Sequence, residues 1–96
     1  MKAAAKTSAA CEITIQNEFG LHARPAAEFV KQANSFRSEI WLVTKSGRFS
    51  ALSLLDVMRA NLDQGATARL EAEGSDAEKA IQRLAEVVRQ LRDNYD

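Results

Sequence analysis

Alternating polar and apolar positions predict four short strands along the chain. Residues 12–16 and 66–72 alternate with a period of two, the spacing of a strand with one buried face. Two β-rich segments, residues 39–44 and 48–52, flank a Lys-Ser-Gly turn, and this arrangement predicts a hairpin. Because four short strands in a chain of this size cannot bury both faces, we expect one sheet with helices on one side.

Apolar residues recur at helical spacing in the segments between these strands. The first helix is expected over residues 23–34, where Pro25 stands in the first turn and costs no hydrogen bond. Ser53 followed by Asp56 predicts an N-cap and a short second helix, and Asn61 is suited to the left-handed conformation at its end.

A third and longer helix is predicted near the carboxyl end of the chain. Ser75 and Glu78 have the spacing of a capping box. The apolar stripe behind it comprises Ala77, Ala80, Ile81, Leu84, Val88, Leu91 and Tyr95. The predicted order is therefore β-α-β-β-α-β-α, and the fold class is α+β with a single four-stranded antiparallel sheet covered on one face by three helices.

Composition narrows the classes of function that this chain can have. Its 96 residues suffice for one domain, and 13 Lys and Arg balance 13 Asp and Glu. This balance argues against nucleic-acid binding and against a polybasic membrane surface. One His and one Cys cannot build a His/Cys metal site or an internal disulfide, and no signal or membrane segment is visible. We expect a cytoplasmic domain at residues 11–96, preceded by a disordered tail at residues 1–10.

The sole histidine stands immediately before a predicted helix, in the segment GLHARPA at residues 20–26. Unpaired N–H groups and the helix dipole favour an anion at such a position, and Arg24 can bind two phosphate oxygens. An unperturbed imidazole, with a pKa near ~6.5, is largely neutral and nucleophilic at neutral pH. His22 and Arg24 therefore indicate a phosphoryl site, although a surface or capping histidine is the simpler alternative.

The longer segment GLHARPAAEFVK, residues 20–31, resembles the phosphorylation-site signature of the HPr family, the phosphocarrier proteins of the bacterial phosphoenolpyruvate-dependent phosphotransferase system. The similarity continues through residues 38–40, 53–55, 64–65 and 73–74, and it spans residues 11–91. The predicted order of elements is also the order of that family, whose fold is an open-faced sandwich.

The resemblance implies that His22 is phosphorylated on Nδ1 by enzyme I and passes the group to sugar-specific IIA proteins, with Arg24 as the counter-charge of the phosphate. A protein of this kind is a stoichiometric carrier rather than an enzyme, uses no cofactor or metal, and is expected to be a monomer. Phe19, three positions before His22, is apolar, so any hydrogen bond to the imidazole must come from elsewhere.

Other residues match regulatory and docking positions of the family. Ser53 matches a second, regulatory phosphorylation position, which implies an HPr Ser kinase/phosphorylase and a catabolite-control transcription factor as further partners, although an N-cap serine is useful without a kinase. The residues that match an apolar docking patch and its basic rim are Leu54, Leu55, Met58, Lys31 and Arg59.

Two other functions stay open at this point. One is a regulatory HPr-like protein, of the nitrogen branch or of a Ser53-phosphorylated signalling type. The other is a small-molecule-binding α+β module of the ferredoxin-like type, for which the order of elements is the only support.

Overall fold

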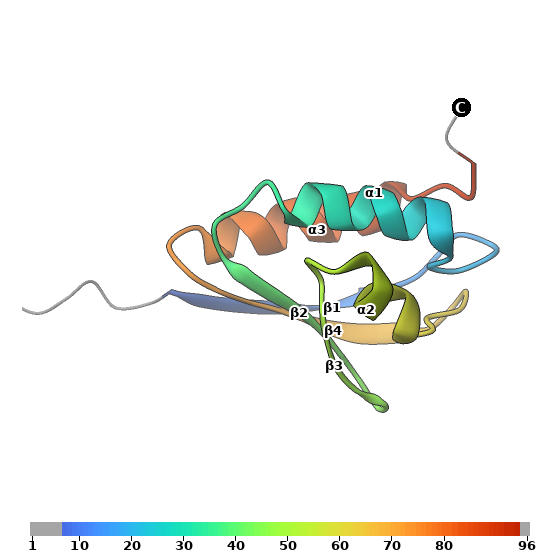
Figure 1. Ribbon diagram of the computed structural model, residues 1–96, viewed down its shortest axis with the longest axis horizontal. Coiled ribbons are helices and arrows are strands. Elements are labelled where there is room, and N and C mark those ends of the chain that lie inside the picture. Colours follow the sequence, from blue (N-terminus) through green and yellow to red (C-terminus); the bar gives the residue numbers. More distant parts are fainter. Residues whose placement is uncertain (1–6, 95–96) are drawn as a thin grey trace, which may run out of the picture.

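The computed structural model describes residues 7–94. Within them, the chain has the predicted order of elements (Figure 1). These are β1 (Ser8–Thr14), α1 (Ala23–Ala33), β2 (Glu39–Thr44), β3 (Gly47–Ser50), α2 (Leu54–Arg59), β4 (Thr67–Glu73) and α3 (Ala77–Gln90).

The strands form one antiparallel sheet in the order β1-β4-β2-β3. β4 lies between two partners, and its Leu70 stands opposite Cys11 of β1 on one side and Leu42 of β2 on the other. Ala68, Leu70 and Ala72 of β4 are buried, whereas the residues between them are more exposed. The period of two therefore gives the sheet one buried face, as predicted.

The helices all lie on that buried face. Figure 1 shows α1 and α3 side by side above the sheet, and α2 packs against α1 and β3. Phe29 of α1 and Leu84 of α3 are fully buried between the layers. Burial of one such side chain contributes about 1.5–3 kcal/mol relative to leaving it exposed. The fold class predicted from the sequence is confirmed.

β1 begins earlier than the sequence predicts. Ser8 pairs with Glu73 and Ala10 pairs with Glu71, so residues 8–10 belong to the sheet. The predicted tail at residues 1–10 is wrong for these three, because Ala and Ser carry little strand propensity and pairing with β4 decides their conformation. The rest of that prediction falls on residues 1–6, which lie outside the described residues.

The third helix begins at a different cap from the predicted one. Its N-cap is Asp76 rather than Ser75, and the Asp76 side chain does not cap the helix. Instead, its carboxylate accepts hydrogen bonds from the Arg37 N–H (2.9 Å) and the Ser38 hydroxyl (2.6 Å), and these two bonds lower the pKa of Asp76. The carboxylate thereby ties the start of α3 to the segment before β2.

The remaining boundaries are close to the predictions. β3 covers Gly47–Ser50 instead of residues 48–52, because the chain turns again before α2. Ser53 is the N-cap of α2, and Asn61 has a positive φ of 53°, both as predicted. Leu91 is buried beyond the end of α3, and Tyr95 lies outside the described residues. No helix in residues 7–94 is long and apolar enough to cross a membrane.

Candidate functional site

The backbone before α1 places His22 at the N-terminus of that helix. Gly20 has a φ of +71°, and a Cβ there would lie 2.5 Å from the Leu62 carbonyl oxygen and 2.8 Å from the Asp63 Cα. Only glycine fits this conformation and this space. The next residue, Leu21, is buried and donates its N–H to the Leu62 carbonyl (2.8 Å). These contacts fix the chain just before His22.

His22 is the N-cap residue of α1, with extended φ and ψ of −85° and −171°. Its side chain makes no capping hydrogen bond, so the simple capping role does not explain it. The side chain is 37% exposed, and Nε2 lies 3.3 Å from Asp93 Oδ1. The Phe19 ring stands edge-on to the imidazole, with 6.1 Å between the ring centroids. The imidazole is therefore held on one side and open to solvent.

Asp93 is itself held by the loop that precedes His22. Its Oδ1 accepts hydrogen bonds from Asn17 Nδ2 (2.8 Å) and from the Phe19 N–H (3.1 Å). The bond from Asn17 is the largest cause of a lowered pKa of Asp93, and the bonds from Phe19 and His22 act in the same direction. The Asp93 carboxylate is thus an anion at neutral pH, and it meets the His22 ring in this ionised form.

The amide of Asn17 is oriented by two acceptors. Its Nδ2 donates to Asp93 and also to the Gly20 carbonyl oxygen, and this leaves Oδ1 buried with no partner among the described residues. A buried acceptor without a partner costs about 1–3 kcal/mol.

Arg24 lies in the first turn of α1, two residues after His22, and is exposed. Its Nη1 donates to Asn94 Oδ1 (3.1 Å). Two consecutive residues therefore contact the site, since Asp93 contacts His22 and Asn94 contacts Arg24. Arg24 and Lys31 line a shallow hollow of about 300 Å³ together with Ala27 and Glu28. The structure therefore brings Arg24 and Lys31 to one surface of α1.

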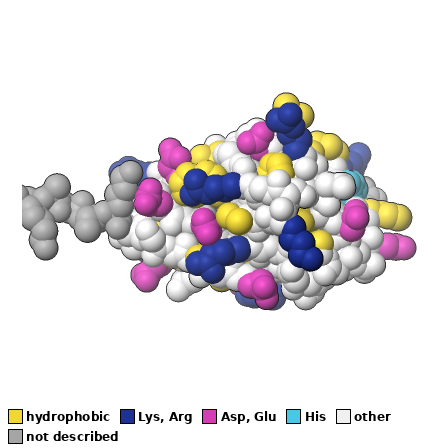
Figure 2. Space-filling model, turned by 90° about the horizontal axis from the view of Figure 1, so that it is seen from below, with side chains coloured by type: hydrophobic (Ala, Val, Ile, Leu, Met, Phe, Trp, Pro, Cys, Tyr) yellow, Lys and Arg dark blue, Asp and Glu magenta, His cyan; other side chains and the backbone are white. Residues whose placement is uncertain are grey.

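The predicted basic rim is not uniformly basic. Arg59 is 69% exposed on α2 and lies within 4.0 Å of Asp56 Oδ1. Glu28 lies between Arg24 and Lys31 at their hollow. The open side of the sheet, which is a different surface, also has acidic and basic side chains interspersed, with the histidine at one end of the molecule (Figure 2).

The predicted docking residues lie on the exposed side of α2. Leu54, Leu55 and Met58 are 40%, 68% and 42% exposed, whereas Val57 points into the core. We call Leu54, Leu55 and Met58 the α2 patch. Three large apolar side chains on so short a helix are unusual for a surface without a partner. Ser53, at its start, accepts the Asp56 N–H at 3.2 Å and is half-buried.

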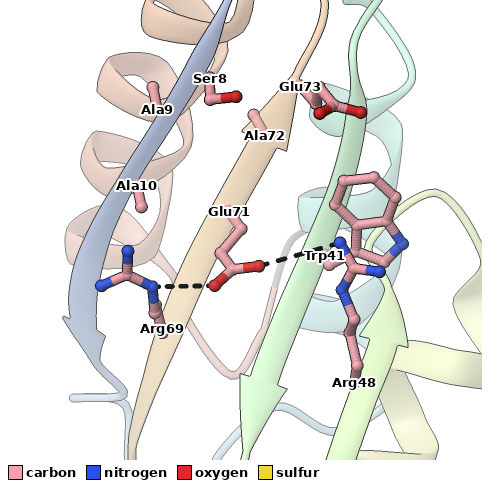
Figure 3. Close-up of a pocket in the computed structure, with 9 residues that line it drawn as sticks. All are labelled: Ser8, Ala9, Ala10, Trp41, Arg48, Arg69, Glu71, Ala72 and Glu73. Carbon is pink, nitrogen blue, oxygen red and sulfur yellow. Dashed lines mark hydrogen bonds and ion pairs between the residues drawn. The ribbon is translucent and has the colours of Figure 1, made fainter.

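A separate cavity of about 380 Å³ lies on the open face of the sheet (Figure 3). Both arginines at this cavity have partners. Arg48 Cζ lies 3.7 Å from the centre of the Trp41 ring, and Arg48 Nη2 lies 3.9 Å from Glu71 Oε1. Arg69 Nε lies 2.9 Å from Glu71 Oε2. Small side chains of β1 leave the space open. The residues that line the cavity do not include the histidine.

Three residues of the site, Asn17, Asp93 and Asn94, were not predicted from the sequence. Asp93 is 71 positions from His22 and 76 from Asn17, so the contacts depend on how α3 returns the chain to the loop. No local pattern marks such residues. The apolar Phe19 was the one available signal, since it requires the partner of the imidazole to come from elsewhere.

The described residues contain no group of three or more His, Cys, Asp or Glu that could hold a metal ion.

Comparison with known proteins points to one family. The family model described as "PTS HPr component phosphorylation site" matches residues 9–90. The phosphocarrier protein HPr of Buchnera aphidicola (Acyrthosiphon pisum) is 40% identical over 80 residues, which are 83% of this chain and 94% of that protein. The multiphosphoryl transfer protein of Haemophilus influenzae is 41% identical over 78 residues, 78% of this chain and 16% of that protein.

The fold agrees with these sequence matches. The crystal structure of HPr-C-His from Thermoanaerobacter tengcongensis superimposes with a TM-score of 0.82 at 39% sequence identity. The match covers 85% of this chain and 92% of that one.

Proposed function

Because the chain belongs to the HPr family of phosphocarrier proteins of the phosphotransferase system, we propose that His22 is the residue that accepts and donates the phosphoryl group. The observation that supports this proposal is the position of the imidazole. It is the only histidine of the chain, and it is partly exposed at the N-terminus of α1, where no capping bond occupies it.

The chemistry needs a nucleophile and a way to balance the charge of the phosphate. A phosphoryl group on the ring would lie near the first turn of α1, whose N–H groups and dipole favour an anion. Arg24, on that turn, supplies a permanent positive charge with two parallel donors. Phosphoryl transfer depends mainly on positioning and on charge stabilisation. An open site can therefore share these tasks with the site of a partner, as a carrier requires, and we propose a carrier without turnover of its own.

We propose enzyme I as the donor and IIA proteins as acceptors, in the cytoplasm. The α2 patch supplies an apolar contact, and Arg24, Lys31 and Arg59 supply positive charge for partners with acidic rims. α2 packs against α1, so the patch and the histidine belong to neighbouring elements. A monomer leaves both surfaces free for these partners.

The regulatory role of Ser53 stays a prediction. Its hydroxyl accepts the Asp56 N–H, which already explains a serine at this position. A phosphate on Ser53 would add negative charge next to the α2 patch and repel acidic partners. Incubation with an HPr Ser kinase and ATP, followed by mapping of the phosphorylated residue, tests this role.

Phosphorylation by purified enzyme I and phosphoenolpyruvate tests the proposed function. We expect one acid-labile, base-stable phosphate per chain, and none on a folded His22→Ala variant. Ser53→Ala is the control and should accept the same phosphate, because its hydroxyl is not the acceptor. Phosphate that persists on His22→Ala, or that disappears with Ser53→Ala, would refute the assignment.

A further inference from the structure

A carboxylate held against the histidine is the feature of this site that the carrier role alone does not explain. Asp93 Oδ1 lies 3.3 Å from His22 Nε2 and receives two further hydrogen bonds, from Asn17 and from the Phe19 N–H. On the basis of the proposed function, we propose that Asp93 is a positioning residue that keeps the proton of His22 on Nε2 and so leaves Nδ1 as the reacting nitrogen.

The direction of the hydrogen bond follows from the chemistry of the two groups. An ionised carboxylate can only accept, so the neutral ring must place its single N–H on Nε2 in order to make this bond. Nδ1 then has a free lone pair. The contact therefore selects both the tautomer and the orientation of the ring, in the way that a second group orients a catalytic histidine.

The carboxylate is positioned before the phosphate arrives. Asn17 and the Phe19 N–H come from the loop that leads into His22, so the same loop carries the ring and two of the donors to Asp93. Asp93 is 23% exposed, and its Oδ1 has three donors around it. Because these groups are already in place, little free energy is needed to rearrange them when the partner docks.

The same contact acts in both directions of the transfer. In loading, the Nδ1 lone pair forms the N–P bond while the bond from phosphorus to the donor breaks, and its electrons leave with the donor. No proton has to leave Nδ1. In unloading, the nucleophile of the acceptor forms a bond to phosphorus while the N–P bond breaks. The electrons of that bond return to the ring, which departs as a neutral imidazole if Nε2 keeps its proton. Without that proton, the ring would leave as an imidazolate, a much poorer leaving group.

The ring nitrogens can be observed directly because the chain has one histidine. In a ¹⁵N-labelled, untagged protein at a pH where the ring is neutral, long-range proton–nitrogen spectra report which nitrogen carries the proton. We expect the proton on Nε2 and a bare Nδ1. In Asp93→Ala, we expect a mixture of tautomers in fast exchange. A wild-type ring protonated on Nδ1 would overturn the proposal, even if no variant folded.

A second measurement separates positioning from a structural role. Phosphorylated protein is followed as it releases phosphate between pH 5 and pH 10. Asp93→Asn keeps the shape of the side chain and removes its negative charge, which favours the protonated ring. The pH above which the release of phosphate becomes slow should therefore be lower in this variant. For this partly exposed pair, we expect the release of phosphate from Asp93→Asn to be about two- to fivefold slower on the alkaline side. Asp93 is the ionisable group that contacts the ring. Other ionisable groups nearby are Glu18 and Arg24, which flank His22 along the chain, Arg92, which precedes Asp93, and Asp63, which adjoins Gly20.

Glu39→Gln is the matched control, since it removes one exposed negative charge at the start of β2. Its tautomer and its release profile should equal those of the parent protein. Equal shifts in both variants, or none in Asp93→Asn, would overturn the role of Asp93. Either result would leave the proposed function intact if His22 is still phosphorylated, whereas a chain that accepts no phosphate on His22 would refute the proposed function first.

Discussion

Replacement of Gly20 by alanine tests how closely the loop before His22 is packed. Gly20 and Gly65 both have a positive φ, +71° and +85°, so an alanine at either position adopts an unfavourable backbone conformation. That conformation costs about 1–2 kcal/mol at each position. A Cβ at Gly20 would also collide with the backbone of Leu62 and Asp63, whereas nothing lies within 4 Å of a Cβ at Gly65.

The difference between the two variants isolates the collision. Forcing a methyl group into a packed site costs typically about 1–3 kcal/mol, so Gly20→Ala should lose about 2–5 kcal/mol of unfolding free energy and Gly65→Ala about 1–2 kcal/mol. For a domain of this size, each kcal/mol lowers Tm by about 4–8 °C. Urea and thermal unfolding measure both variants, and equal losses would refute the claim that close backbone approach requires Gly20.

Three further predictions concern single groups. Ser53→Ala should lower the unfolding free energy by about 0.5–2 kcal/mol, measured in urea, whereas Ser53→Asp retains a capping oxygen and should lose less; equal losses would contradict the cap. The Arg37 N–H and the Ser38 hydroxyl lower the pKa of Asp76, so its contribution to stability is present above pH ~3.9 and fades as pH falls through the lowered pKa. The difference in unfolding free energy between wild type and Asp76→Asn should therefore shrink in acid. A difference that does not change with pH would contradict the stabilising role of the ionised Asp76 carboxylate. Burial raises the pKa of the Cys11 thiol, so iodoacetamide should label it more slowly in the folded than in the unfolded protein at pH 8, and equal rates would contradict this.

The parts of the fold that could be predicted are those in which the residue type at each position follows from burial or from local backbone conformation. β4 alternates because one of its faces meets the helices, and the apolar stripe of α3 follows its buried side. Ser53 and Asn61 mark the ends of α2 through local backbone preferences. Such signals extend over a few residues and survive any tertiary arrangement.

The parts that could not be predicted depend on contacts distant in sequence. Ser8 and Ala10 become strand residues because β4 offers partners, not because small side chains favour strands. Asp76 bonds to Ser38 across 38 positions rather than capping its helix. In the site, His22 and Arg24 could be recognised from one short segment, but Asp93 had to be brought to the ring by the fold.

The position of the phosphate on His22 tests the central claim most directly. In ¹⁵N-labelled protein phosphorylated by enzyme I and phosphoenolpyruvate, a one-bond coupling between phosphorus and nitrogen identifies the atom that carries the group. The structure predicts that coupling at Nδ1, because Nε2 faces the Asp93 carboxylate. Phosphate on Nε2, or on any residue other than His22, would contradict the account.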